Sequence, residues 1–153
     1  DEVRDLYTFY YPGFNLRSSD LNAFLGISQL KKVDQLALKR QENFYLYKSH
    51  LEEFWCQKSK TDLLSNFAYG VIVKNRLEVY RHLKENGIET RPLICGSIGR
   101  HPFWIKRYGE LCLRNADIIH DNGLYLPNHN KIGKLEIKYI SEKFTEVAEP
   151  LLF

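Results

Sequence analysis

Two polar residues, Asn15 and Arg17, stand just before the longest helical pattern in the chain. At the start of a helix, unpaired backbone N–H groups and the positive end of the helix dipole favour an anion. Asn15 and Arg17 are therefore candidates for binding a phosphate group. The alternative is that Ser18 or Ser19 caps the helix, while Asn15 and Arg17 bond to nearby backbone and carboxylate groups.

Two further loops carry more polar side chains than a simple connection needs. One runs from Arg91 to Arg100 and includes Ser97, and the other is Asn128-His129-Asn130. Arg91 can either clamp a phosphate or carboxylate through its planar guanidinium or form an ordinary surface ion pair. His129 can either donate to a substrate oxygen or stabilise its own loop. We expect these loops to lie on the rim of one small unit.

Other kinds of active site are not indicated. The five histidines show no spacing typical of a metal site, and no Gly-x-Ser-x-Gly motif is present. The three cysteines are odd in number and far apart, without a Cys-x-x-Cys pair, which favours reduced thiols in a cytosolic protein. We therefore predict no catalytic residue and no metal ligand in this sequence.

The composition is that of a globular domain, with 153 residues of which 44% are hydrophobic and 27% are charged. The net charge of +3 is spread along the chain, and the basic pairs Lys31-Lys32 and Lys39-Arg40 have acidic residues close by. We therefore expect no nucleic-acid partner. No apolar run approaches the roughly 20 residues that span a bilayer, so we expect no membrane partner and a cytoplasmic location.

The candidate loops connect a small number of predicted elements. A helical pattern runs from residue 19 to about residue 54, with Gly26 marking either a bend or a close packing contact. Pro92 confines its strand to an edge or a strand end. Strands are predicted at 67–73, 88–94 and 124–126, and further helices at 76–85, 101–108, 111–120 and 133–148. This order indicates an α+β fold.

Three segments, taken in order, resemble the DegT/DnrJ/EryC1/StrS family of sugar aminotransferases and dehydratases that depend on pyridoxal phosphate. They begin with Gly13-Phe14-Asn15-Leu16-Arg17, Gly87-Ile88-Glu89-Thr90-Arg91 and Asn115-Ala116-Asp117, and the last extends through Leu126-Pro127-Asn128-His129. Tyr7-Thr8-Phe9-Tyr10 and the Gly96-Ser97 turn most resemble the branch that removes the C3 hydroxyl of nucleotide-linked 4-keto-6-deoxy sugars. A His-Tyr stretch more typical of the aminotransferase branch is absent.

The resemblance implies the fold of type I pyridoxal-phosphate enzymes, which pair a large cofactor domain with a small C-terminal α+β domain in a homodimer. Residues 1–18 would end the large domain, residues 19–55 would form a long connecting helix, and residues 56–153 would form the small domain, a small sheet flanked by helices. The family's cofactor-anchoring lysine, or the histidine that replaces it in the C3 dehydratases, lies upstream of this sequence. We therefore expect a C-terminal fragment or shortened relative that is inactive alone and binds no cofactor alone.

The resemblance also implies roles for particular residues. Asn15 resembles the asparagine that reaches the phosphate of pyridoxal or pyridoxamine phosphate in the neighbouring subunit, and Arg17 would support it or contact the same charge. A nucleotide-linked keto sugar would contact four residues, Arg91, Ser97, Arg100 and His129. The complete enzyme would be a 3-dehydratase or, alternatively, a sugar aminotransferase. An alternative of another class is a non-catalytic interaction module whose exposed apolar helix binds a partner.

Overall fold

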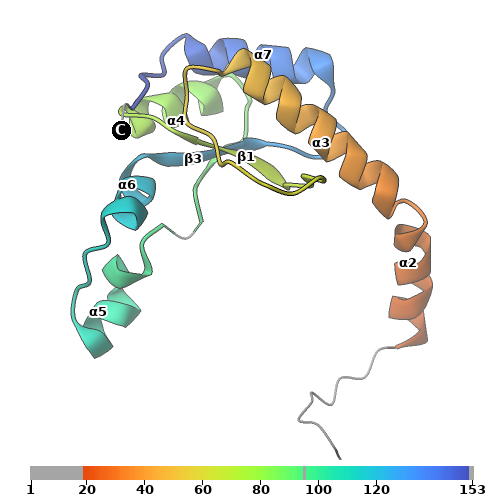
Figure 1. Cartoon of the computed structure of the whole chain (residues 1–153), viewed down its shortest axis with the longest axis horizontal. Helices are drawn as coiled ribbons and strands as arrows, with labels where there is room; N and C mark the ends of the chain where they lie inside the picture. Colours follow the sequence, from red (N-terminus) through yellow and green to blue (C-terminus); the bar gives the residue numbers. More distant parts are fainter. Residues whose placement is uncertain (1–18, 95, 152–153) are drawn as a thin grey trace, which may run out of the picture. The chain divides into compact units, whose positions relative to one another are not determined.

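The computed structural model describes residues 19–94 and 96–151, and Figure 1 shows the order of their helices and strands. The chain divides into two compact units, Asp1–Val33 and Asp34–Phe153. Helix α2 (Asp20–Leu30) belongs to the first unit, and the sheet with its surrounding helices belongs to the second.

Helix α2 begins at the serine cap that the sequence offered as one alternative. The side-chain oxygen of Ser19 accepts a hydrogen bond from the backbone N–H of Asn22 at 3.3 Å, which satisfies one of the free donors of the first turn. No residue of α2 is buried, although much of the helix is apolar; its exposed large side chains are Leu21, Phe24, Leu25, Ile27 and Leu30.

The helical pattern predicted for residues 19–55 forms two helices rather than one. Helix α2 ends at Leu30, a turn follows at Lys31-Lys32, and α3 runs over Val33–His50. The N–H of Lys32 bonds to the carbonyl of Gln29, three residues earlier, which tightens the last turn and ends the helix. Gly26 is not the break, since it lies within α2 and a Cβ there would meet nothing within 4 Å.

A three-stranded antiparallel sheet forms the centre of the second unit. Its strands are β1 (Ala68–Ile72), β2 (Arg91–Pro92) and β3 (Gly123–Pro127), in the spatial order β1-β3-β2. Tyr69 pairs with Leu126, and Arg91 pairs with Tyr125. Strand β2 is shorter than predicted but lies at an edge, as expected for a strand that contains proline.

One face of the sheet is covered by α3, α4 (Arg76–Glu85) and α7 (Lys134–Thr145), which together form the hydrophobic core. Tyr47 of α3 stacks on Tyr69 of β1 with ring centroids 5.0 Å apart. Helix α4 packs against α7, and Figure 1 shows both on the same side of β1 and β3. The fully buried side chains of this core include Val71, Val79, Leu83, Leu124, Leu126, Ile137 and Phe144.

The chain between β2 and β3 forms a short 3₁₀ helix, η1 (Ile98–Arg100), and the helices α5 (Pro102–Tyr108) and α6 (Arg114–Asn122). Helix α6 starts three residues later than predicted. The carboxylate of Asp117 accepts the backbone N–H of Leu113 at 2.8 Å, and this contact closes the first turn. Helix α4 has its predicted bounds and is followed by Gly87 at φ 74°, the left-handed conformation that ends many helices.

Replacing Phe144 by alanine should lower the free energy of unfolding by about 3–5 kcal/mol, because the ring is fully buried and packs edge-on against Phe54. Leu135→Ala is the matched control on the same helix. Its side chain is 80% exposed, so its loss should change the free energy by no more than about 0.5 kcal/mol. Urea denaturation measures both, and equal effects would contradict this placement of the core.

Candidate functional site

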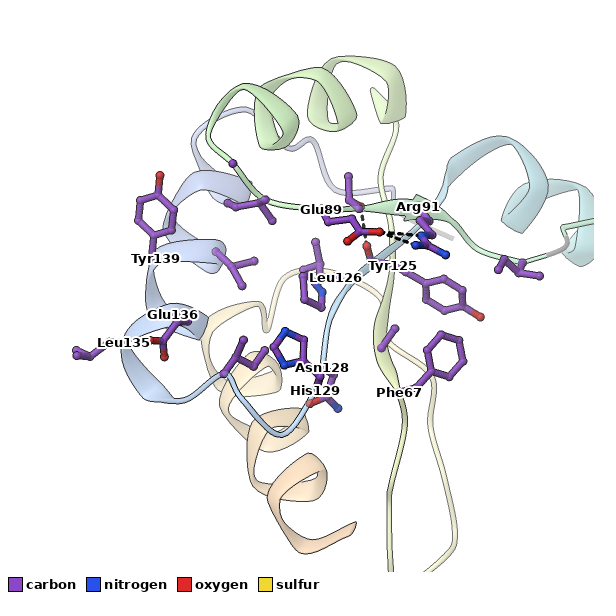
Figure 2. Close-up of a pocket in the computed structure, with 18 residues that line it drawn as sticks. Phe67, Glu89, Arg91, Tyr125, Leu126, Asn128, His129, Leu135, Glu136 and Tyr139 are labelled. Carbon is purple, nitrogen blue, oxygen red and sulfur yellow. Dashed lines mark hydrogen bonds and ion pairs between the residues drawn. The ribbon is translucent and has the colours of Figure 1, made fainter. Parts of the chain in front are cut away.

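A pocket of about 750 Å³ lies where β3 ends, between α7 and the segment that leads into β2 (Figure 2). Leu126, Ile132 and Ile140 contribute apolar side chains to it, and Phe67 and Tyr125 form an aromatic pair with ring centroids 5.4 Å apart. The two polar residues predicted for substrate binding that line this pocket are Arg91 and His129. The second unit thus brings the side chain of Arg91, in β2, and that of His129, after β3, to one cavity.

Arg91 forms the ion pair that the sequence allowed as an alternative. Its Nε and Nη2 donate to Oε1 of Glu89 at 3.1 and 2.5 Å, as the dashed lines in Figure 2 show. Both side chains are largely exposed, so the pair contributes little to stability. A guanidinium held this weakly remains suited to an anionic ligand, because exchanging one carboxylate for another anion costs little.

His129 stabilises its own loop, which was also one of the two alternatives. Its Nδ1 accepts the backbone N–H of Lys131 at 3.2 Å, so in the neutral ring the proton is on Nε2. Nε2–H is therefore the donor that this ring can present to a ligand. The hydrogen bond within the loop and a contact with a ligand are compatible, because they use different nitrogen atoms.

Two buried asparagines that were not among the predicted site residues hold this loop in place. The side-chain amide of Asn128 donates to the carbonyls of Arg40 and Asn66, and that of Asn43 donates to the carbonyls of His129 and Ile132. Both asparagines are almost fully buried. A signal for Asn43 was present: it lies one turn before Tyr47 and thus on the apolar face of α3.

The end of β3 next to the pocket is not open to an added strand. Pro127 has no N–H, and its carbonyl accepts a hydrogen bond from the hydroxyl of Tyr47 at 2.8 Å. A ligand in this pocket would therefore not pair with the backbone at the end of β3.

Ser97 and Arg100 are not among the residues that line this pocket. They belong to the loop of residues 96–100, which contacts the end of α6. The backbone N–H of Ser97 donates to Nδ1 of His120 at 3.2 Å. The hydroxyl oxygen of Ser97 is buried and has no hydrogen-bond partner among the described residues. Such a group is costly unless it acquires a partner, and a bound substrate can supply one.

Arg100 is held by an ion pair with Asp121. Its Nη1 donates to both carboxylate oxygens, at 2.9 and 2.8 Å. The hydrogen bond from Arg100 lowers the pKa of Asp121, and the same bond raises the pKa of Arg100. Because both contacts are made by Nη1, the other guanidinium nitrogens keep donors that this ion pair does not use.

The predicted site residues thus fall into two groups in the structure. Arg91 and His129 share the pocket, while Ser97 and Arg100 lie on the 96–100 loop against α6. The predicted phosphate ligands, Asn15 and Arg17, lie outside the described residues. Among residues 19–94 and 96–151, no three His, Cys, Asp or Glu side chains are arranged to hold a metal ion. No helix in this part is long and apolar enough to cross a membrane.

Comparison with known proteins gives a family match over most of the chain. The family described as "DegT/DnrJ/EryC1/StrS aminotransferase family" matches residues 2–145. GDP-4-keto-6-deoxy-D-mannose 3-dehydratase from Escherichia coli O55:H7 is 27% identical over 152 residues, which cover 93% of this chain and 39% of that protein. A UDP-4-amino-4,6-dideoxy-N-acetyl-beta-L-altrosamine transaminase from Campylobacter jejuni serotype O:2 is 28% identical and covers 90% and 39% respectively.

The fold is also that of a solved relative. The structure of E. coli GDP-4-keto-6-deoxy-D-mannose-3-dehydratase with bound hydrated PLP matches 94% of this chain and 40% of its own, with a TM-score of 0.76 and 26% identity. This chain thus spans about two fifths of the length of its relatives. The predicted family and the predicted α+β fold class are confirmed, and the division at residues 18 and 55 stays a prediction.

Replacing Arg100 by glutamine should raise the pKa of Asp121 towards its ordinary value, because the hydrogen bond from Arg100 is the main cause of the lowered pKa. A lowered pKa in the folded state stabilises the protein above the unfolded pKa of about 4, and this stabilisation is lost as the pH falls through the folded pKa. The stability difference between the two proteins should therefore shrink below about pH 4.

Carboxyl-carbon NMR titration measures the pKa of Asp121 directly. Lys143→Gln is the matched control, because it removes the main cause of the lowered pKa of Glu146 and does not touch Asp121. An Asp121 titration that is the same with and without Arg100 would rule out the ion pair.

Proposed function

Because this chain belongs to the DegT/DnrJ/EryC1/StrS aminotransferase family, we propose that it is the C-terminal part of a nucleotide-sugar enzyme dependent on pyridoxal or pyridoxamine phosphate. The proposed reaction is the 3-dehydration of a 4-keto-6-deoxy sugar. The observation that carries the proposal is the similarity over 93% of the chain to a dehydratase of that type. The likeness of the fold to a solved dehydratase with bound PLP supports it.

A sugar aminotransferase is the second candidate. The similarity to the Campylobacter jejuni transaminase is of the same size and covers almost the same part of this chain. The exposed apolar face of α2 also fits the interaction-module hypothesis. However, part of a larger enzyme, separated from the rest, would expose such a face as well. The dehydratase is preferred because the E. coli dehydratase matches 93% of this chain, against 90% for the transaminase.

Asn15 and Arg17 are the residues proposed to hold the cofactor phosphate, in the neighbouring subunit of a cytoplasmic homodimer. An amide and a guanidinium are donors suited to a phosphate. Because Ser19 supplies the cap of α2, Asn15 is not needed for that task. When bound, the cofactor would supply an electron sink for the bonds broken at the sugar carbons.

The described residues would bind and orient the nucleotide sugar. Arg91 and Arg100 are proposed to donate to the diphosphate or to a sugar oxygen, because each keeps donors beyond its carboxylate partner. His129 would donate through Nε2–H, and the unpartnered hydroxyl of Ser97 would take its missing hydrogen bond from the substrate. None of these residues is proposed to move a proton during the reaction.

The proposal is tested with the full-length natural protein that contains this chain. The protein, supplied with PLP and L-glutamate, is incubated with GDP-, dTDP- and UDP-linked 4-keto-6-deoxy sugars, and the products are identified by mass spectrometry. We expect a sugar without its C3 hydroxyl, whereas an amino sugar would support the aminotransferase instead. The 153-residue chain alone should give no turnover. If the full-length protein forms neither product, the enzymatic proposal fails.

In the same full-length protein, Asn15→Ala should weaken cofactor binding by about 1.5–3 kcal/mol, because it removes a hydrogen bond to a charged phosphate. Equilibrium titration with PLP, followed by its visible absorbance, measures the dissociation constant. Asn22→Ala is the control, since this asparagine is exposed on α2 one turn beyond the cap. An unchanged cofactor affinity would reduce Asn15 to a residue of the helix entry.

A further inference from the structure

His120, near the end of α6, accepts a hydrogen bond that defines its protonation state. The backbone N–H of Ser97 donates to Nδ1 of His120 at 3.2 Å. A ring nitrogen accepts only when it carries no proton, so His120 is neutral in this contact and its proton is on Nε2. A backbone N–H can only donate. If His120 were protonated, its Nδ1 would also carry a proton, and the two donors could not form this bond.

The loop is shaped to let the imidazole approach its backbone. Gly96 has φ 69°, a conformation that favours glycine, and a Cβ at this position would lie 2.5 Å from Nδ1 of His120. Any side chain at residue 96 would therefore push the ring away from the N–H of Ser97. Both the conformation and the missing side chain of Gly96 serve the contact between the loop and His120.

The backbone of His120 is itself held by α4, so His120 can position what it binds. A guanidinium nitrogen of Arg76, in the first turn of α4, donates to the carbonyl of His120. The 96–100 loop has two further attachments: Arg100 pairs with Asp121, and the carbonyl of Gly99 accepts the N–H of Leu111 at 3.2 Å. Of these attachments, only the one through His120 depends on an imidazole.

We propose that His120 is a positioning residue that, as the neutral Nε2–H tautomer, holds the 96–100 loop with Ser97 and Arg100 in the geometry that binds the nucleotide sugar. The substrate part of this inference rests on the proposed function, whereas the hold on the loop does not. Ser97 is the residue most directly affected, because its N–H is the donor and its buried hydroxyl is the group without a partner.

The proposal makes the loop sensitive to pH. Imidazole side chains gain a proton between about pH 7.5 and 5.5, and a protonated His120 would release the N–H of Ser97. The charged and titratable groups near His120 are His101, whose ring centroid lies 5.9 Å away, Asp121 with its partner Arg100, and Arg76. His101 is the one other imidazole among these groups, so the experiment must separate the two histidines.

Hydrogen–deuterium exchange of the full-length protein, read by mass spectrometry on peptides that contain Ser97, tests the hold on the loop. After correction for the intrinsic pH dependence of exchange, the protection of the loop should fall about fivefold between pH 7.5 and 5.5. In His120→Ala the protection should be low at both pH values. In His120→Asn, whose amide oxygen accepts at any pH, the protection should be partly restored and independent of pH.

Two control variants separate this effect from other titrations. His82→Asn changes a histidine of α4 that pairs with Glu146, the residue after α7, so the pH dependence should remain. His101→Asn should also leave it in place. The positioning role is overturned if the wild-type protection does not change with pH, if His120→Ala keeps full protection, or if His101→Asn removes the pH dependence.

Kinetics with GDP-4-keto-6-deoxy-D-mannose test the link to the substrate. His120→Ala should raise KM about fivefold or more with a smaller change in kcat, and His120→Asn should recover part of the loss. The substrate part of the inference is overturned if the loop loses protection at low pH as expected but the KM of His120→Ala is unchanged. Because the exchange measurement needs no substrate, it decides the hold on the loop even if the proposed activity fails.

Discussion

The antiparallel pairing of β3 with β1 is the constraint on which the rest of the second unit depends. Its register places Tyr69 opposite Leu126 and Val71 opposite Leu124, so these four side chains face α3, α4 and α7. A shift of one residue would turn this apolar set to the other face of the sheet. The stacking of Tyr47 on Tyr69, with the bond from its hydroxyl to Pro127, joins α3 to both strands and opposes such a shift.

The same strand separates the two groups of candidate site residues. Helix α6 leads directly into β3, so Asp121 and the 96–100 loop lie at its start, while His129 follows its end. Five residues of a strand span on the order of 15 Å, a distance that a nucleotide sugar can bridge but a single amino-acid side chain cannot. An extended ligand is therefore the kind of molecule that could meet both groups. This geometry agrees with the proposed substrate class and leaves the individual contacts as proposals.

Asparagine side chains that bond to the backbone give the loops of this unit their definite shape. Asn43 and Asn128 hold the chain around His129, and Asn75 joins the start of α4 to Val147 and Glu149 near the end of the chain. Asn43 and Asn128 are almost fully buried, and each replaces lost contacts with water by hydrogen bonds to backbone carbonyls, so removing either side chain would cost those bonds. The contacts of Asn43 and Asn128 hold His129 at the pocket without adding a charged group to the core.

Several features were determined by the sequence alone, because their signals are local. The bounds of α4 follow from an amphipathic run between Asn75 and Gly87, and the edge position of β2 follows from the missing N–H of Pro92. The three motifs and their order along the chain were sufficient to predict the family. Recognising a family in this way depends on residue identity rather than on spatial arrangement.

Only the tertiary structure decided that β3 is central, that Ser97 and Arg100 lie apart from Arg91 and His129, and that His120 accepts from Ser97. These features join residues that are far apart along the chain, and the apolar pattern of a strand does not indicate which strand will be its neighbour. The turn at Lys31-Lys32 was likewise not predictable, because backbone hydrogen bonds end α2 while the apolar pattern continues into α3.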